Sequence, residues 1–198
     1  MPNLYRRLRY GRPIVVVSGL PRSGTSMAMK MLEAGGLSVV TDGLRTADED
    51  NPKGYYEDER VKDLHQAGDK TWLRQSRGRV IKIISFLLKS LPADNNYQVL
   101  FMHRNLKEIV ASQNKMLVRR GEKNDTPDER AVALLDEQVR DARFFLRRPQ
   151  FEVLELNYRE TLDSPRPLAL KMAGFVGRPL DVDKMTQVVD VQLYRNRS

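Results

Sequence analysis

Short apolar runs alternate with longer segments of helical periodicity along the chain. The apolar runs cover residues 14–18, 79–85, 97–103 and 151–157, with a shorter run at 37–40. The first run is almost wholly valine and isoleucine, which is typical of a strand buried on both faces of a sheet. We therefore predict a strand at each of these five places.

The segments between the strands carry helix signals. One helix is expected to open at a glycine-rich loop and to cover about 24–35, and a second to follow Asn105 as far as about 119. A third is expected to begin near Ser164 and to end before Gly177, since glycine commonly terminates helices.

A further helix is predicted over 126–148. Thr126 is expected as its N-cap, Pro127 as its first helical residue, and Glu129 as the partner of Thr126 in a capping box. An apolar stripe at helical spacing follows these residues, so one face of this helix is expected to pack on the core.

Strands that alternate with helices predict a mostly parallel sheet with helices on both faces, which is a three-layer αβα fold. With 198 residues, we expect a single domain over 1–198. Ligands bind at the carboxyl ends of the strands in such folds. Two long connections, 41–60 and 119–129, follow predicted elements; the first is acidic and long enough to be functional, and the second is either a mobile lid or a surface connection.

The composition of the chain limits the classes of partner that it can be expected to bind. The net charge of +8, from 34 basic and 26 acidic residues, favours anionic partners, although a solvated basic surface also accounts for it. Nucleic acid is not expected as the main partner, because the basic residues are scattered and no aromatic platform lies among them. No apolar run has the length of a signal peptide or membrane span, so we expect a cytoplasmic protein without a membrane partner.

The chain contains no cysteine and two histidines, His65 and His103. Disulfides, thiolate catalysis and cysteine-bound zinc are therefore excluded, and so is a histidine-rich metal site.

Residues 19–26, GLPRSGTS, fit the phosphate-binding pattern G-x-x-x-x-G-K-[ST] except that Thr25 replaces the lysine. The glycines let backbone N–H groups point inward, and the helix that follows adds its positive dipole end. The alternative is a tight turn without a ligand, but the cluster of hydroxyls and the arginine favour an anion site. The residues expected to hold the anion are Arg22, Ser23, Gly24, Thr25 and Ser26.

A magnesium-dependent phosphoryl transferase also needs an aspartate at the end of a nearby strand. The run at 97–103 ends in His103 and is followed by Arg104, and the run at 151–157 ends in Asn157; the nearest aspartate is Asp42. A group transfer that requires no metal is therefore favoured.

A second anion site is predicted after the strand at 97–103. Arg104 is expected at the carboxyl edge of the sheet, and Ser112 lies eight residues later, about two turns along the helix that Asn105 caps. The pair could grip one phosphate, with the arginine supplying charge-assisted hydrogen bonds. The alternative is that Arg104 is an ordinary exposed arginine and Ser112 an ordinary helical serine. The first anion site favours a binding role, because one nucleotide can carry two phosphates.

Together, GLPRSGTS at 19–26 and RNLKEIVAS at 104–112 resemble the sulfotransferases that use 3′-phosphoadenosine 5′-phosphosulfate (PAPS). The likeness is greatest to small bacterial sulfotransferase-like proteins that carry NPKGYYE, here at 51–57, and a terminal LYRN, here at 193–196. The resemblance implies a fold like that of the P-loop nucleoside-triphosphate hydrolases and sulfuryl transfer from PAPS, with PAP as product and no metal.

The resemblance also implies roles for particular residues. The 5′ side of PAPS would be held by Arg22, Ser23, Gly24, Thr25 and Ser26, and Arg22 would stabilise charge on the sulfuryl group and the leaving phosphate. Arg104 and Ser112 would take the 3′-phosphate. Lys82 stands where cytosolic members have the lysine of a Lys-Thr-His strand. Ile84 replaces the catalytic histidine of that strand, and Met27 replaces the tryptophan that stacks on adenine.

A general base on the acceptor would contribute about 10²–10⁴-fold. Its candidates are Glu57, Asp42, Asp58 and His65, and we prefer Glu57 because other branches of the family use a glutamate and its loop is expected to face the cleft. The alternative is that the acidic residues at 57–59 begin a helix, near its N-terminal dipole.

The sequence thus favours a sulfotransferase acting on a hydroxyl or amine of a small molecule, peptide or carbohydrate. Two alternatives stay open: a small-molecule kinase of the P-loop fold that uses Asp42, and a non-catalytic module that binds PAP or another nucleotide.

Overall fold

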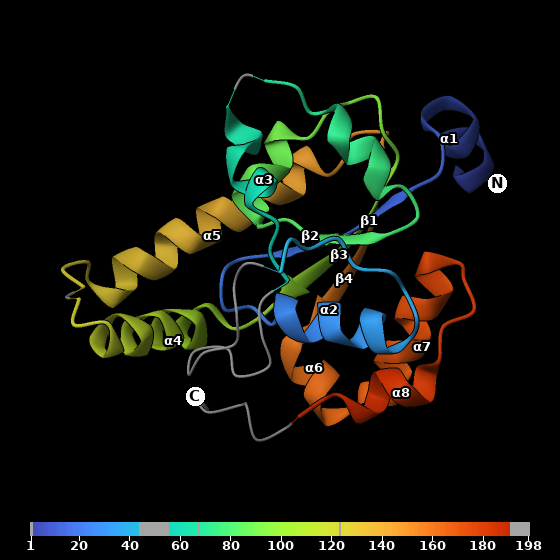
Figure 1. Cartoon of the computed structure of the whole chain (residues 1–198). Coiled ribbons are helices and arrows are strands. Elements are labelled where there is room, and N and C mark those ends of the chain that lie inside the picture. The colour runs from blue at the N-terminus through green and yellow to red at the C-terminus, as the bar shows by residue number, and fades with distance from the viewer. Residues whose placement is uncertain (1, 44–55, 67, 123, 191–198) are drawn as a thin grey trace.

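A four-stranded parallel sheet forms the centre of the molecule (Figure 1). The computed structural model describes residues 2–43, 56–66, 68–122 and 124–190. Its strands are β1 (Ile14–Gly19), β2 (Val80–Lys82), β3 (Tyr97–His103) and β4 (Phe151–Asn157), in the order β2-β1-β3-β4. All pairs in the sheet are parallel, as the alternation of strands and helices predicts.

Helices cover both faces of the sheet, which confirms the three-layer αβα prediction (Figure 1). One face packs on α4 (Leu106–Arg119), α5 (Asp128–Phe145) and the short helices α3 (Glu59–Lys62), η1 (Asp63–His65), η2 (Thr71–Ser76) and η3 (Ser85–Ser90). The other packs on α2 (Thr25–Ala34), α6 (Tyr158–Asp163), α7 (Pro165–Val176) and α8 (Val182–Gln187). Each face therefore has its own apolar core.

The central strand behaves as its composition predicts. Every residue of β1 is buried, and Val16 lies opposite Val99 of β3 and Ile81 of β2. A strand with neighbours on both edges and helices on both faces has no polar side, which explains the run of branched apolar residues.

Two of the five predicted strands are shorter in the structure or absent from it. The run at 79–85 forms a strand only over Val80–Lys82, because η3 begins at Ser85. The run at 37–40 is not a strand but a single bridge between Val39 and Val80. Most apolar residues of the two runs are buried in the core, and burial alone does not distinguish a strand from an irregular buried segment.

Three of the predicted helices are confirmed, as α2, α4 and α7. Asn105 caps α4 by accepting a hydrogen bond from the backbone of Lys107 at 2.9 Å. Gly177 follows the end of α7 in a left-handed conformation with φ of 67°, where glycine has no steric penalty.

The start of α5 was predicted wrongly. The helix begins at Asp128 with Pro127 in the N-cap position, and no side chain caps it. Proline disfavours helical backbone in the residue before it, so Thr126 stays outside the helix, where its N–H donates to Asn124 Oδ1 at 3.1 Å. The helix ends at Phe145 and not at 148, because the next residues tighten into turns.

The helix α1 (Pro2–Tyr10) was not predicted at all. It precedes β1 and lies at the side of the molecule, near the amino ends of the strands (Figure 1). None of the helices within the described residues has the length and apolarity needed to cross a lipid bilayer.

Candidate functional site

The loop between β1 and α2 contains three residues whose backbone φ is positive. Gly19, Arg22 and Gly24 have φ values of 150°, 72° and 99°. A Cβ on Gly24 would lie 2.4 Å from the ring of Tyr158, and one on Gly19 would lie 2.7 Å from the carbonyl oxygen of Met102. These two positions therefore accept only glycine, for steric as well as conformational reasons.

Arg22 is the one residue other than glycine, within the described part of the chain, whose φ is positive. Such a conformation costs about 1–3 kcal/mol and persists only where the surroundings enforce it. Arg104 Nη1 donates to the carbonyl oxygen of Arg22 at 3.1 Å, and Arg22 Nε donates to Ser112 Oγ at 3.0 Å. The two anion sites that the sequence predicts separately are thus in direct contact.

Arg104 is held by contacts with three other residues. Its Nε donates to Glu108 at 2.9 Å, the two side chains are 9% and 7% exposed, and its guanidinium lies 4.7 Å from the centre of the Tyr158 ring. Sequence reasoning missed both Glu108 and Tyr158, although Tyr158 directly follows a strand at its carboxyl end. Arg104 consequently supports the loop as well as carrying charge.

The loop also contains a buried hydroxyl with no hydrogen-bond partner. Ser23 is 1% exposed, and its Oγ makes no hydrogen bond within the described residues. Thr25, also buried, begins α2, and Ser26 follows it with partial exposure. Because an unpaired buried donor is costly, a phosphate oxygen in the loop would satisfy Ser23. The residues of the loop therefore fit a bound phosphate.

A cavity of about 180 Å³ opens beside Ser23, between the end of β3 and the helices α4 and α5. Its walls combine apolar side chains with charged ones. The lining residues are Leu20, Ser23, Met102, His103, Arg104, Leu106, Ile109, Asp136, Val139 and Arg143.

Three polar side chains meet at the His103 side of this cavity. His103 Nε2 lies 3.1 Å from Glu155 Oε2, and Arg143 binds both oxygens of Glu155, at 3.0 and 2.9 Å. Burial lowers the pKa of His103 below its ordinary value, and Arg143 adds to this effect while Glu155 opposes it. The imidazole is therefore neutral near pH 7.

The pKa of Glu155 is also lowered. Burial works to raise it, but the hydrogen bond from Arg143 and the charges of His103 and Arg143 outweigh burial. Sequence reasoning missed this cluster; polar residues near the ends of two buried strands are the signal that could have found it.

Lys82 and Glu57, the preferred general base, lie on the other side of β1. Lys82 stands opposite Val17 in the sheet register, and its Nζ is 3.3 Å from Glu57 Oε1. The two side chains are 10% and 25% exposed. Glu57 is therefore the anionic partner of a lysine that lies within an apolar strand. Ile84 packs against the apolar core.

The remaining candidate bases serve local structure. Asp58 caps α3 by accepting from the backbone of Arg60 at 3.1 Å, and Asp42 accepts from the backbone of Glu59 at 2.6 Å. His65 is exposed, with Nδ1 2.7 Å from the carbonyl oxygen of Lys62. The acidic residues beside Glu57 do therefore begin a helix, whereas Glu57 itself pairs with Lys82.

Parts of two motifs lie outside the described residues: most of NPKGYYE at 51–57, and LYRN at 193–196. Within the described part of the chain, no three His, Asp or Glu side chains gather as metal ligands do.

Replacing Arg104 with lysine is expected to lower the free energy of unfolding by about 1–2 kcal/mol, because a single ammonium cannot make both the Glu108 and the Arg22 contacts. Urea denaturation measures the change. Arg140→Lys is the matched control: its pair with Asp136 has the same spacing of four residues but is 70% exposed, so its change should stay below about 0.5 kcal/mol. Equal effects of the two substitutions would contradict the structural role of Arg104.

Comparison with known proteins finds similar solved structures but no similar sequence. No protein-family model matches the sequence, and neither does any curated protein. Among the solved structures that are similar to this chain, two share 15% sequence identity with it. The sulfotransferase domain from the curacin biosynthetic pathway aligns over 90% of this chain and 78% of its own, with a TM-score of 0.52. The sulfotransferase from Alicyclobacillus acidocaldarius aligns over 86% and 85%, with a TM-score of 0.50. At this identity the likeness establishes architecture, and the chain has the fold of these two sulfotransferases.

Proposed function

We propose that the chain transfers a sulfuryl group from PAPS to a hydroxyl or amine acceptor. The observation that carries the proposal is the contact between the two anion sites, in which Arg22 Nε donates to Ser112 Oγ at 3.0 Å. A ligand with one phosphate in the loop and another beside α4 would engage both sites at once. PAPS has phosphates at two such places and supplies the sulfuryl group when bound.

The donor side would use the loop and the start of α4. The 5′ side would be held by backbone N–H groups and hydroxyls of the loop and α2, from Ser23, Gly24, Thr25 and Ser26. Arg22 would lie between the two phosphates and stabilise charge on the leaving phosphate. Arg104 and Ser112 would contact the 3′-phosphate, and Arg104 already orders the loop through Arg22.

The acceptor side would use Glu57 and Lys82. Glu57 would take the proton of the acceptor hydroxyl or amine on its carboxylate as the new bond to sulfur forms and the bond from sulfur to the leaving phosphate oxygen breaks. Lys82, 3.3 Å away, would hold that carboxylate in place. The acceptor is a small molecule, or the exposed group of a peptide or carbohydrate.

Calorimetry with PAP tests the donor side. PAP is expected to bind at least about tenfold more tightly than AMP, because only PAP offers a 3′-phosphate for charge-assisted hydrogen bonds. Ser112→Ala should weaken PAP binding more than AMP binding, because AMP has no 3′-phosphate and loses only the indirect effect of Ser112 on Arg22. Ser38→Ala, a substitution outside the site, is the control and should change neither. Absence of PAP binding, or equal affinities for the two nucleotides, would refute the proposal.

Turnover distinguishes the alternatives. Transfer of sulfate from radiolabelled PAPS to a panel of alcohols, amines, peptides and sugars is the expected outcome. Magnesium-dependent phosphoryl transfer from ATP would instead identify a kinase, and PAP binding without transfer to any acceptor would identify a nucleotide-binding module.

A further inference from the structure

The helix α1 exposes its apolar side chains and buries an arginine, which is the opposite of a helix that packs on an apolar core. Its leucines and one tyrosine face outward: Leu4, Tyr5 and Leu8 are 64%, 61% and 79% exposed. Its buried residue is an arginine, Arg6, which is 9% exposed. Surface helices normally place apolar side chains toward the protein and arginines toward water, so the exposed face of α1 lacks the environment that its residues favour.

Polar contacts fix α1 in this orientation. Arg6 Nη1 donates to the carbonyl oxygen of Phe151 at 3.1 Å, and Arg6 also forms an ion pair with Glu152 at the start of β4. Arg77 Nη2 donates to the carbonyl oxygen of Tyr10 at 3.2 Å, at the end of the helix. A free helix of nine residues is marginal in water, so these contacts hold α1 with its apolar face outward.

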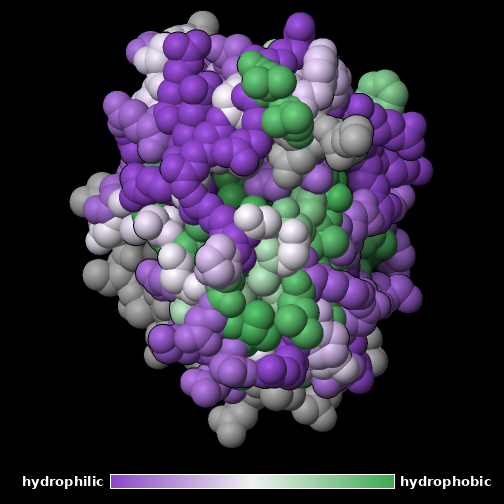
Figure 2. All heavy atoms as spheres, turned by 90° about the vertical axis from the view of Figure 1, so that its right-hand side faces the viewer, coloured by the Kyte–Doolittle hydropathy of each residue, from purple (hydrophilic) through white to green (hydrophobic). Residues whose placement is uncertain are grey.

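The outward apolar face is bordered by arginines. Residues four apart lie on the same side of a helix, so Leu4 and Leu8 stand together, with Tyr5 adjacent and the exposed Arg7 and Arg9 on either flank. Figure 2 turns this side of the molecule toward the viewer, and apolar surface near its top stands within strongly hydrophilic surroundings. The border is therefore cationic while the centre is apolar.

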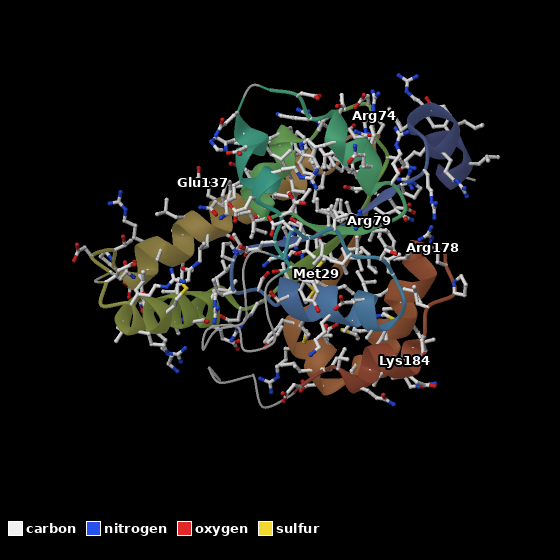
Figure 3. The ribbon with its side chains drawn as sticks, viewed as in Figure 1. Met29, Arg74, Arg79, Glu137, Arg178 and Lys184 are labelled. Atoms are coloured by element: carbon white, nitrogen blue, oxygen red, sulfur yellow. The ribbon has the colours of Figure 1, made fainter. Side chains whose placement is uncertain are left out.

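More arginines continue this surface beyond the helix. The guanidinium of Arg12 lies against Gly78, and Arg178 Nη1 donates to the carbonyl oxygen of Gly78 at 2.8 Å. Arg79, next along the chain, is exposed. Figure 3 shows Arg79 and Arg178 on the side of the sheet on which α1 lies. Together with the net charge of +8, they make this side of the protein complementary to an anionic surface.

We propose that α1 binds the surface of a membrane that contains anionic lipids. Leu4, Tyr5 and Leu8 enter the boundary between headgroups and acyl chains, while Arg7, Arg9 and Arg12 contact anionic headgroups. An apolar centre with an arginine border matches such a boundary, which is apolar inside and anionic outside. The proposal departs from the expectation that no membrane is a partner, which rested on the lack of a spanning segment.

The attachment leaves the candidate site open. The helix α1 contacts the amino ends of the strands, through Phe151 and Glu152 of β4 and the chain that leads into β1. The phosphate-binding loop follows the carboxyl end of β1, about 20 Å away for a strand of six residues. Binding through α1 therefore requires no movement of the loop.

Co-sedimentation of the full chain with vesicles tests the proposal. Vesicles of phosphatidylcholine mixed with phosphatidylserine should bind the protein, and vesicles of phosphatidylcholine alone should bind it at least about tenfold more weakly, since each arginine near an anionic surface contributes several-fold. Binding should weaken as salt is added, because screening reduces the attraction.

Two double variants separate the apolar and electrostatic contributions. Leu4→Gln with Leu8→Gln should lower binding by about tenfold or more, and Arg7→Gln with Arg9→Gln by a similar factor. Glutamine keeps the helix propensity of leucine. Leu170→Gln and Arg140→Gln are the controls, since both residues are exposed on other helices, and neither should change binding.

Three results would overturn the proposal. The first is absence of binding to anionic vesicles, or binding that the leucine variant leaves unchanged. The second is equal binding to a DNA duplex with no effect of the leucines, which would mean a general polyanion surface. The third is a concentration-dependent dimer, seen by sedimentation velocity and dissolved by the leucine variant, which would mean that α1 pairs with a second copy.

Discussion

Replacing Gly24 with alanine is expected to lower the free energy of unfolding by about 2–4 kcal/mol and to weaken PAP binding at least about a hundredfold. A Cβ at this position would lie 2.4 Å from Cδ2 of Tyr158 and 3.0 Å from Cε2, and the backbone has φ of 99°. The ring cannot move away easily, because Tyr158 is buried and stacks beneath the guanidinium of Arg104. The loop itself must therefore shift, and its N–H groups shift with it.

Gly36 provides the matched control for this prediction. It also has a left-handed backbone, with φ of 95°, but nothing lies within 4 Å of the Cβ that alanine would add. Gly36→Ala therefore measures the conformational penalty alone, about 1 kcal/mol. Urea denaturation gives the stabilities and calorimetry gives the PAP affinities. Equal losses for the two variants would mean that the contact with Tyr158 carries no part of the effect.

The fold was predictable because the strands of a buried parallel sheet appear in the sequence as continuous apolar runs. Valines and isoleucines at 14–17 and the apolar run at 97–103 gave strands that the structure confirms. Such runs arise because both faces of the strand are covered. The same reasoning failed at 37–40, where a single bridge to Val80 takes the place of a strand, and at 83–85, where the chain turns into η3. Hydrophobicity reports burial, and it is not sensitive to backbone pairing.

The candidate site was predictable only as far as local sequence determines it. The loop at 19–26 is a continuous motif, so its glycines and hydroxyls could be read directly. Arg104 and Ser112 were predicted as a phosphate pair, and the structure adds that Arg104 braces Arg22 and that Glu108 balances its charge. Contacts between side chains from different elements depend on how the helices pack on the sheet, and no local pattern encodes them.

The His103 cluster illustrates the same limit. His103 and Glu155 occupy neighbouring strands two register positions apart, and Arg143 reaches them from α5. Each of the three residues is ordinary in its own segment. Only the parallel register of β3 and β4, together with the position of α5, brings the three together, and two of them, His103 and Arg143, line the cavity beside Ser23. The structure therefore adds a second titratable group near the loop, on the side of β1 opposite to Glu57.

Replacing Glu57 with glutamine is expected to reduce kcat by about 10²–10⁴-fold and to leave PAP binding within a few-fold of its original value. Glutamine keeps the size of the side chain and can still lie near Lys82, but it cannot take a proton. Single-turnover transfer from PAPS measures the rate, and calorimetry with PAP verifies that the donor side is intact. Unchanged turnover would remove Glu57 from the reaction.

His103 is the competing proton acceptor, and the two are separable by pH. Burial lowers the pKa of His103 from its ordinary value, so the imidazole is neutral at pH 7 and becomes protonated in more acidic solution. A reaction that used His103 as base would lose activity as the pH falls through this pKa, and His103→Gln would abolish that dependence together with most of the rate. Since we assign the proton transfer to Glu57, His103→Gln should retain turnover within about tenfold, and His65→Gln, at an exposed histidine, should have no effect. The position of Glu57 beside Lys82 of β2, outside the cavity of His103, then implies that the acceptor approaches from the β2 side of the loop.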